Sequence, residues 1–457
     1  MSSVLLIYPF FKPSHDRSIF RFQPLGLAYI ASSLRKAGHI VEILDCTFMD
    51  RQDATRAVLG QKRDVVGIYC MATMRADCIR FAKLLRHSCT LLVAGGPLPS
   101  CDPVSFTEDF DIVVKGEGEQ TILEILGAYQ NGCDFSSIPG LVFRKGTFTT
   151  SGKGGEIVFT RPRGLENDLD SIAFPARDLL PNNRYIAHSK SKFGYAITSI
   201  ITTRGCPFTC EFCSNAVFGI SYRERSHENV VDEVEQVLAL GYDRVHFGDD
   251  VFTLKRERII KICEEIITRR LNFRWECLGR ADSIDLNLAR TMQAAGCDRI
   301  FFGIESGNDS ILKLIGKKIT VDSARKAVEA THLAGIRTGG FFILCYPGET
   351  DNTVLDTIRF ATSLPFDYLS FTIPYPLPGT ALFEKVKSSI TKEWGPQHGI
   401  LTDHSLIFDT GFSEHKMKFA IVKGNLQYLL KKRLGRWAVF LEKPFEIVSD
   451  AMFKAMK

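Results

Sequence analysis

Strand-length apolar runs alternate with helical segments along the first third of the chain. The runs occupy residues 4–10, 40–46, 65–72, 90–97 and 111–119. Between them apolar residues recur at helical spacing, as in residues 24–38. Short apolar runs between helices predict a parallel sheet that is covered on both faces. We therefore expect an α/β fold that begins with a doubly wound domain over residues 1–133, with its ligand beyond the carboxyl ends of the strands.

The pattern changes over residues 134–194. An apolar stretch with a Gly- and Lys-rich centre, residues 141–162, predicts a hairpin, and coil punctuated by prolines follows it. We expect this region to connect two domains.

A second alternating series starts at Tyr195. Its apolar runs are 195–202, 244–250, 274–280, 299–306, 339–348 and 368–375. Six βα repeats predict a partial (β/α)6 barrel over residues 195–385, with its chemistry at the C-terminal ends of the strands. Residues 386–457 predict a mainly helical region, in which a basic helix at 419–441 acts as a lid or binds a partner.

The composition is that of a soluble globular protein, with 45% hydrophobic and 24% charged residues. No basic stretch precedes the first apolar run, and no run of 18 apolar residues occurs. We therefore expect no signal peptide, no membrane span and a cytoplasmic location. Residues 385–457 hold 13 Lys and Arg against 7 Asp and Glu, which indicates an acidic partner or a solvated helix face. We expect a monomer that binds no nucleic acid.

Three of the thirteen cysteines stand close together in the sequence RGCPFTCEFC, directly after the first strand of the second series. They are Cys206, Cys210 and Cys213. A structural zinc ion takes four protein ligands and a disulfide takes two, whereas a [4Fe–4S] cluster held by three thiolates leaves one iron open. The alternatives are three buried structural cysteines or a zinc knuckle. Phe212 is placed to cover one side of a cluster.

The pattern C-x-x-x-C-x-aromatic-C after a barrel strand resembles the radical S-adenosylmethionine (SAM) superfamily, over about residues 195–385. The resemblance implies that the three cysteines ligate the cluster and that the open iron binds SAM, which is split into methionine and a 5′-deoxyadenosyl radical. It also implies SAM contacts at the ends of the barrel strands, for each of which a structural role is the alternative. The candidate SAM-binding residues are Asp249, Asp250, Arg280, Glu305 and Ser306.

A doubly wound domain before such a barrel resembles the cobalamin-binding class of the superfamily. In this class small residues line a channel beside the sheet, a role that the resemblance gives to Gly95, Gly96, Gly116 and Gly118. Tyr69 and Met71 stand where the class often has Ser-x-Leu, and Arg75 follows them. We include these three residues among the candidate cobalamin contacts.

The motif Asp-x-His-x-x-Gly, which supplies a histidine below cobalt in many cobalamin domains, does not follow the first strand. His15 has neither the Asp nor the Gly at the right offset, so we expect no histidine ligand from this segment. The lower face of cobalt then meets residues 71–75 or water. A nucleotide or flavin is the alternative ligand, although G-x-G-x-x-G is missing, and a domain that has lost its ligand is another.

The resemblance implies methylation of an unactivated carbon by the 5′-deoxyadenosyl radical and methylcobalamin, with an external electron donor of the ferredoxin or flavodoxin type. Domain order, length and basic tail are similar to the archaeal C-methyltransferases that modify a glutamine of methyl-coenzyme M reductase. This similarity implies a protein or peptide substrate, and so a post-translational modification in methanogenesis. The alternatives are a non-methylating cyclisation, rearrangement or lipid-tailoring enzyme, and a cobalamin or redox sensor that does not cleave SAM.

Overall fold

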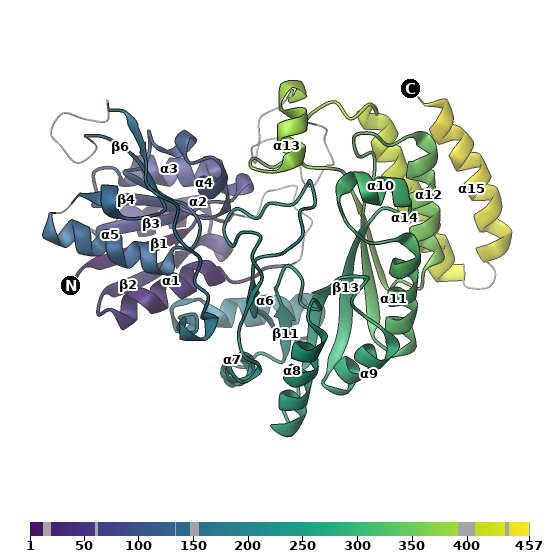
Figure 1. Ribbon diagram of the computed structural model, residues 1–457, viewed down its shortest axis with the longest axis horizontal. Helices are drawn as coiled ribbons and strands as arrows, with labels where there is room; N and C mark the ends of the chain where they lie inside the picture. The colour runs from purple at the N-terminus through teal and green to yellow at the C-terminus, as the bar shows by residue number, and fades with distance from the viewer. Residues whose placement is uncertain are drawn as a thin grey trace.

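The computed structural model describes residues 1–11, 20–59, 63–132, 134–146, 155–391, 407–434 and 438–456. Two mainly parallel sheets stand side by side, the first from the N-terminal part of the chain and the second from its middle (Figure 1). The last two helices lie on the outer side of the second sheet. Among the described residues, no helix is long and apolar enough to cross a membrane. The predicted fold class is confirmed.

The first sheet has seven strands in the order β2-β1-β3-β4-β5-β6-β7. They are β1 Ser3–Tyr8, β2 Ile40–Asp45, β3 Arg63–Tyr69, β4 Cys89–Gly95, β5 Ile112–Val114, β6 Leu141–Arg144 and β7 Ile157–Phe159. Helices α1 (Leu25–Lys36) and α5 (Glu119–Asn131) pack on one face, and α2 (Arg51–Leu59) and α3 (Arg75–Leu85) pack on the other. Successive strand residues point to opposite faces, so both faces are apolar and both are covered.

The predicted hairpin forms as β6 and β7, but it does not stand apart in the connector. Strand β6 pairs antiparallel with β5 and continues the first sheet. Both strands are buried, so their backbone N–H and C=O groups cannot bond to water. Pairing of the two strands gives these groups hydrogen-bond partners. The rest of the connector holds α6 (Asn182–Phe193). Short helices occur along the whole described chain. The 3-10 helices are η1 Cys46–Phe48, η2 Ala72–Met74, η3 Val104–Phe106, η4 Phe135–Ser137, η5 Leu169–Ser171, η6 Arg177–Leu179 and η7 Lys387–Ser389, and the short α-helix α4 spans Pro97–Cys101.

The second sheet is a partial barrel of six parallel strands in the order β8-β11-β12-β13-β14-β15. They are β8 Ile197–Ile200, β11 Arg244–Phe247, β12 Arg274–Gly279, β13 Cys297–Glu305, β14 Arg337–Ile343 and β15 Tyr368–Thr372, so each predicted run forms a strand. Each of the first five strands is followed by a helix, and β13 is followed by two. These helices are α7 His227–Ala239, α8 Arg256–Thr268, α9 Leu286–Ala294, α10 Asp309–Ile315, α11 Val321–Leu333 and α12 Asp351–Ser363. The residues of each strand that face these helices form the largest apolar core, with Trp275 and Phe302 fully buried.

The C-terminal region is helical, as predicted, with α13 (Ala381–Val386), α14 (Glu414–Leu434) and α15 (Ala438–Ala455). Helices α14 and α15 pack against each other and against α12, at the right-hand edge of Figure 1. It is α13 that meets the cysteine loop, where the backbone N–H of Leu382 donates to Glu211. Helix α14, which holds most of the predicted basic helix at 419–441, packs against α12, α15 and β15 on the side of the barrel. Its role as a lid or as a surface for a partner stays a prediction.

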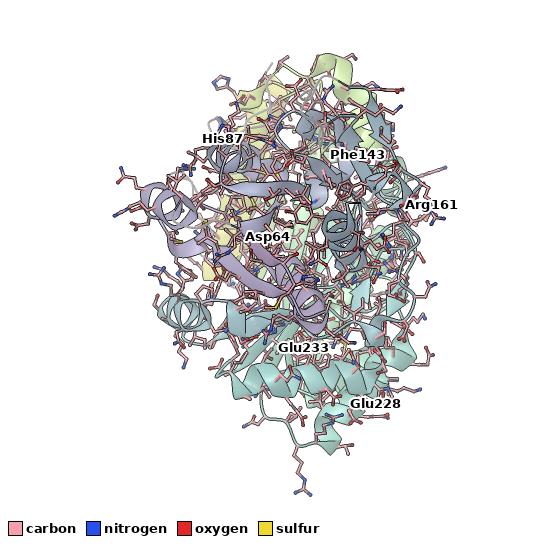
Figure 2. All side chains as sticks on the ribbon, turned by 90° about the vertical axis from the view of Figure 1, so that its left-hand side faces the viewer. Asp64, His87, Phe143, Arg161, Glu228 and Glu233 are labelled. Atoms are coloured by element: carbon pink, nitrogen blue, oxygen red, sulfur yellow. The ribbon has the colours of Figure 1, made fainter. Side chains whose placement is uncertain are left out.

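A buried polar junction ties the two sheets together. Arg177 of the connector donates to Gln23, which precedes α1, and to Thr198 of β8, at 2.9 and 3.0 Å. It also pairs with Glu233 of α7 at 2.7 Å, and Arg225 pairs with the second oxygen of the same carboxylate at 2.5 Å. Glu233 is fully buried, and Figure 2 shows it near the middle of the molecule.

We expect Glu233→Ala to lower the free energy of unfolding by about 3–5 kcal/mol, because two buried guanidinium groups lose their shared counter-charge. Urea titration of the purified chain measures this change. Glu228 lies on the same helix, its side chain is 57% exposed and it is labelled near the surface in Figure 2. The control Glu228→Ala should change the free energy by less than about 0.5 kcal/mol. Equal effects of the two substitutions would contradict the role given to the junction.

Candidate active site between the two sheets

The three predicted cluster cysteines lie in the loop that follows β8. A two-residue ladder between β9 (Thr203–Arg204) and β10 (Arg223–Glu224) closes this loop at its base. Gly205 has φ +83°, and a Cβ atom there would lie 2.1 Å from the carbonyl oxygen of Ser221, so only glycine fits. The backbone N–H of Cys213 donates to the carbonyl of Cys210 at 3.0 Å, which turns the chain between these two cysteines.

The thiols of Cys206, Cys210 and Cys213 lie within electrostatic reach of one another. Although Cys213 is exposed at the surface, the surrounding protein partly desolvates its thiol and raises its pKa to about 11, and the charges of Asp250, Cys210 and Cys206 add to this rise. Burial also raises the pKa of Cys206, with smaller contributions from Asp250 and Cys210. A cationic group bound here would stabilise the neighbouring thiols as thiolates.

A single metal ion and a [4Fe–4S] cluster require different distances between their thiolate ligands. Within the described parts of the chain, no three His, Cys, Asp or Glu side chains are arranged to hold one metal ion. A [4Fe–4S] cluster sets its thiolate ligands further apart, because each one binds a different iron. That these three thiols ligate a cluster stays a prediction. Phe212 packs on the apolar group that includes Ile311 and Ile315, beside the cysteines.

Asp249 and Asp250 follow β11 and have different surroundings. The carboxylate of Asp249 is buried and accepts from the backbone N–H groups of Thr202 and Thr203, at 2.5 and 3.0 Å, and from the Thr202 hydroxyl. Asp249 thus holds the start of the cysteine loop, which is the structural alternative to the predicted SAM contact. Asp250 stands beside Cys206 and Cys213, and burial together with Asp249 raises its pKa. Its predicted contact with SAM stays a prediction.

The other predicted SAM residues are also engaged with the protein. The guanidinium of Arg280 stacks on the Phe208 ring at 3.6 Å and donates to the carbonyls of Lys317 and Lys318, at 2.7 and 2.9 Å. The Ser306 hydroxyl hydrogen-bonds to Thr357 at 2.9 Å, and caps the next turn. Both side chains therefore support loops around the cysteines in this structure, and the predicted contact of each with SAM is not tested.

Glu305 ends β13 beside the cysteine loop, with a strained backbone at φ +75°. Its carboxylate accepts from the Lys317 ammonium at 3.0 Å. Burial lowers the pKa of Lys317, but Glu305 and Cys210 outweigh burial and leave it raised. The sequence did not single out Lys317, because its proximity to the cysteines depends on the loop after α10.

A cavity of about 450 Å³ lies between the two sheets. The first sheet lines it with Tyr69 and with all four predicted glycines, Gly95, Gly96, Gly116 and Gly118. A Cβ atom on Gly95 would meet no atom within 4 Å, so the missing side chain leaves room for a ligand. These residues fit the predicted channel beside the sheet. The barrel contributes Ser199, Ile201, His246 and Gly248 to the same cavity.

Two candidate cobalamin residues lie outside this cavity. Met71 and Arg75 do not line it, and Arg75 is exposed with its guanidinium 5.8 Å from the Phe106 ring centroid. His15 lies outside the described residues. The structure therefore does not join residues 71–75 to the glycine-lined cavity, and a contact of this stretch with cobalt remains untested.

A polar row crosses the barrel interior at the level of the cavity. Register places Ser199, His246, Glu276 and Arg299 opposite one another on four neighbouring strands. His246 Nδ1 lies 3.2 Å from Glu276 Oε1, and Arg299 donates to Glu276 Oε2 at 2.9 Å. Among the described residues, His246 Nε2 has no hydrogen-bond partner, and this histidine lines the cavity. The signal in the sequence was a polar or charged residue inside each apolar run, namely Ser199, His246, Glu276 and Arg299.

A second buried junction joins the cavity to the cysteine loop. Glu117 stands between Gly116 and Gly118, which line the cavity, and its carboxylate meets Arg204 at 3.1 Å and Arg223 at 2.9 Å. Arg204 also pairs with Glu119, and stands two residues before Cys206. Burial alone would raise the pKa of Glu117, but the two arginines outweigh burial and lower it. The carboxylate is therefore charged and holds the two loops together.

We expect Glu117→Gln to weaken the binding of hydroxocobalamin about tenfold or more and to lower the iron content of the chain, because the loops of both sheets lose their shared charge. Absorbance titration and iron analysis measure the two effects. Glu124→Gln is the matched control, since Glu124 pairs with Arg163 without linking the two sheets. Loss of cobalamin binding with unchanged iron content would show that the junction does not couple the two loops.

Two segments of the chain match known protein families. Residues 200–361 match the radical SAM superfamily, and residues 18–126 match the B12 binding domain. The chain is 35% identical over 370 residues to an uncharacterized methyltransferase of Pyrococcus horikoshii, which covers 79% of this chain and 78% of that protein. It is 27% identical over 477 residues to the anaerobic magnesium-protoporphyrin IX monomethyl ester cyclase of Rubrivivax gelatinosus, which covers 97% of this chain and 83% of that protein.

A solved structure shares the whole architecture. The cobalamin-dependent SAM radical enzyme OxsB, with aqua-cobalamin and SAM bound, superposes with a TM-score of 0.76 at 17% identity. The superposition covers 99% of this chain and 72% of that one. At this identity the likeness shows the fold, in which a B12-binding sheet faces a radical SAM barrel.

Proposed function

Because the chain belongs to the radical SAM enzymes that carry a B12-binding domain, we propose that it is a cobalamin-dependent methyltransferase that acts on an unactivated carbon. One observation carries the proposal: the cavity that the glycines of the first sheet line also reaches the barrel and Arg204, which stands two residues before Cys206. We propose that cobalamin lies against the glycines and that the substrate lies on the barrel side, between the two cofactor sites. Such placement suits a reaction that uses both cofactors on one carbon.

The proposed cofactors are a [4Fe–4S] cluster, SAM and cobalamin. When bound, they supply hydrogen abstraction from carbon and a methyl group for that carbon. We propose that Cys206, Cys210 and Cys213 hold the cluster and that Asp250, which stands beside Cys206 and Cys213, accepts a hydrogen bond from SAM. Gly95 leaves room for cobalamin, because a Cβ atom there would meet no protein atom within 4 Å. The electron donor is proposed to be a ferredoxin or flavodoxin.

The residues of the barrel interior would hold and orient the substrate. Glu276 fixes the Nδ1 side of His246, so Nε2 is presented to the cavity as the free hydrogen-bonding atom. Arg299 pairs with the other oxygen of the buried Glu276 carboxylate. The remaining walls are largely apolar, which excludes water from the reacting carbon.

For the substrate, we propose a side chain of a protein or peptide, such as a glutamine of methyl-coenzyme M reductase. Support for a methyl acceptor comes from the similarity to the Pyrococcus methyltransferase. A second candidate function is ring closure without methyl transfer, which is favoured by the similarity to the cyclase over 97% of the chain. The two functions differ in whether the SAM methyl group appears in the product.

We expect the reconstituted, chemically reduced protein to cleave SAM to 5′-deoxyadenosine, and to transfer the methyl group of deuterated SAM to a glutamine peptide of methyl-coenzyme M reductase. Mass spectrometry of nucleoside and peptide measures both products. An oxidised or cyclised product without the label would favour the cyclase. An unlabelled, unchanged peptide with 5′-deoxyadenosine present would reject this substrate but not SAM cleavage.

We expect Cys213→Ala to abolish 5′-deoxyadenosine formation, because the cluster loses one of three protein ligands. Cys89→Ala is the control: Cys89 is a half-buried thiol at the start of β4 whose Sγ donates to the Leu85 carbonyl, far from the cysteine loop in sequence. Its variant should keep the wild-type rate. Wild-type protein that forms no 5′-deoxyadenosine would reject both candidate functions and favour a sensor.

A further inference from the structure

Helix α15 presents an apolar face to solvent. Ile447, Val448 and Met452 are 67%, 59% and 52% exposed, and Leu441 is 56% exposed. Pro444, Ala451 and Ala455 are exposed on the same side of the helix. We call the exposed residues 441, 444, 447, 448, 451, 452 and 455 the α15 face. Soluble proteins seldom expose so many adjoining apolar side chains without a partner for them.

The side of α15 that packs against the protein is the more polar one. Arg359 of α12 pairs with Glu446 at 2.7 Å and with Asp450, and Lys423 of α14 pairs with Asp450 at 2.9 Å. Ser449 and Phe453 are buried on the same side. These polar contacts fix the orientation of the helix, so its apolar residues point outward in the folded chain.

The neighbouring helix α14 adds an apolar stripe of its own. Val422, Leu426 and Leu429 are 54%, 45% and 42% exposed, and their spacing of four and three residues places them on one side of the helix. The two helices pack against each other at the edge of the molecule. Each of the two C-terminal helices therefore exposes an apolar stripe.

The charges that border the α15 face are cationic. Lys443 and Lys454 are exposed, and neither forms an ion pair with a described residue. The acidic residues of the helix are engaged elsewhere: Glu442 faces Lys431 at 3.7 Å, and Glu446 and Asp450 pair with Arg359. Arg433 is exposed near the end of α14. An apolar helix face with a lysine border fits the surface of an anionic bilayer.

We propose that the α15 face docks this enzyme on the surface of an anionic lipid bilayer. The apolar side chains enter the boundary between headgroups and acyl chains, while Lys443 and Lys454 meet lipid phosphates. A second copy of the chain is the weaker occupant, because two such faces would bring lysine borders together. In Figure 1 α15 lies at the edge of the molecule opposite the N-terminal sheet, so docking leaves the cavity between the sheets uncovered.

Co-sedimentation of the full chain with vesicles tests this proposal. We use vesicles of phosphatidylcholine with phosphatidylglycerol, and vesicles of phosphatidylcholine alone. The wild type should bind the anionic vesicles and bind less as salt is added. The triple variant Ile447→Asp, Val448→Asp and Met452→Asp should bind at least about tenfold more weakly. Lys443→Glu with Lys454→Glu should weaken binding about fivefold for each lysine.

The matched control is Leu333→Asp, because Leu333 is 72% exposed at the end of α11 and lies outside the α15 face. It should bind like the wild type. Circular dichroism and 5′-deoxyadenosine formation without vesicles show that each variant is folded, and they keep this test separate from the proposed reaction. Wild-type protein that ignores anionic vesicles, or a triple variant that binds them equally well, would overturn the proposal. A dimer that the triple variant abolishes would assign the face to a second copy instead.

Discussion

The contact between Glu117 and the two arginines Arg204 and Arg223 is the constraint on which the rest of the site depends. All three side chains are at most 9% exposed, so each charge has lost its water and relies on the others. The glutamate comes from the loop that lines the cavity, and Arg204 opens the segment that carries the cysteines. Any shift of one sheet against the other would separate buried charges. The junction thus fixes the distance between the proposed cobalamin and cluster sites, which a reaction on one carbon requires.

Side chains alternate along each barrel strand between the apolar core and the barrel interior. Along β11 and β12, Val245, Phe247, Trp275 and Cys277 point to the helices and form the core, while His246 and Glu276 point to the interior. A strand can therefore stay apolar enough to fold and still place one charged side chain in the cavity. The buried carboxylate is tolerated because Arg299 neutralises it. Folding and substrate orientation are thus assigned to opposite faces of one sheet.

Much of the fold and the position of the cysteine loop can be predicted from the sequence. The length of an apolar run, the helical periodicity and the spacing of the cysteines are all local properties of the chain. The positions of the polar residues at the strand ends are not. Asp249 and Asp250 are adjacent, yet one holds backbone N–H groups and the other stands beside the thiols, because the chain turns between them. Glu117 and Lys317 carry no motif, and their roles come from contacts across loops far apart in sequence. The hairpin was predicted, but its pairing with β5 depends on a free sheet edge that no local pattern reveals.

The proposed function requires the cobalamin site and the cluster site to lie close together on either side of the substrate. Electron paramagnetic resonance of the protein loaded with cobalamin, with cobalt as Co(II) and the cluster reduced, tests this most directly. We predict a magnetic interaction between the two spins that splits or broadens the cobalt signal, and that disappears when the cluster is oxidised to its diamagnetic state. A cobalt spectrum that is the same in both states of the cluster would contradict the claim.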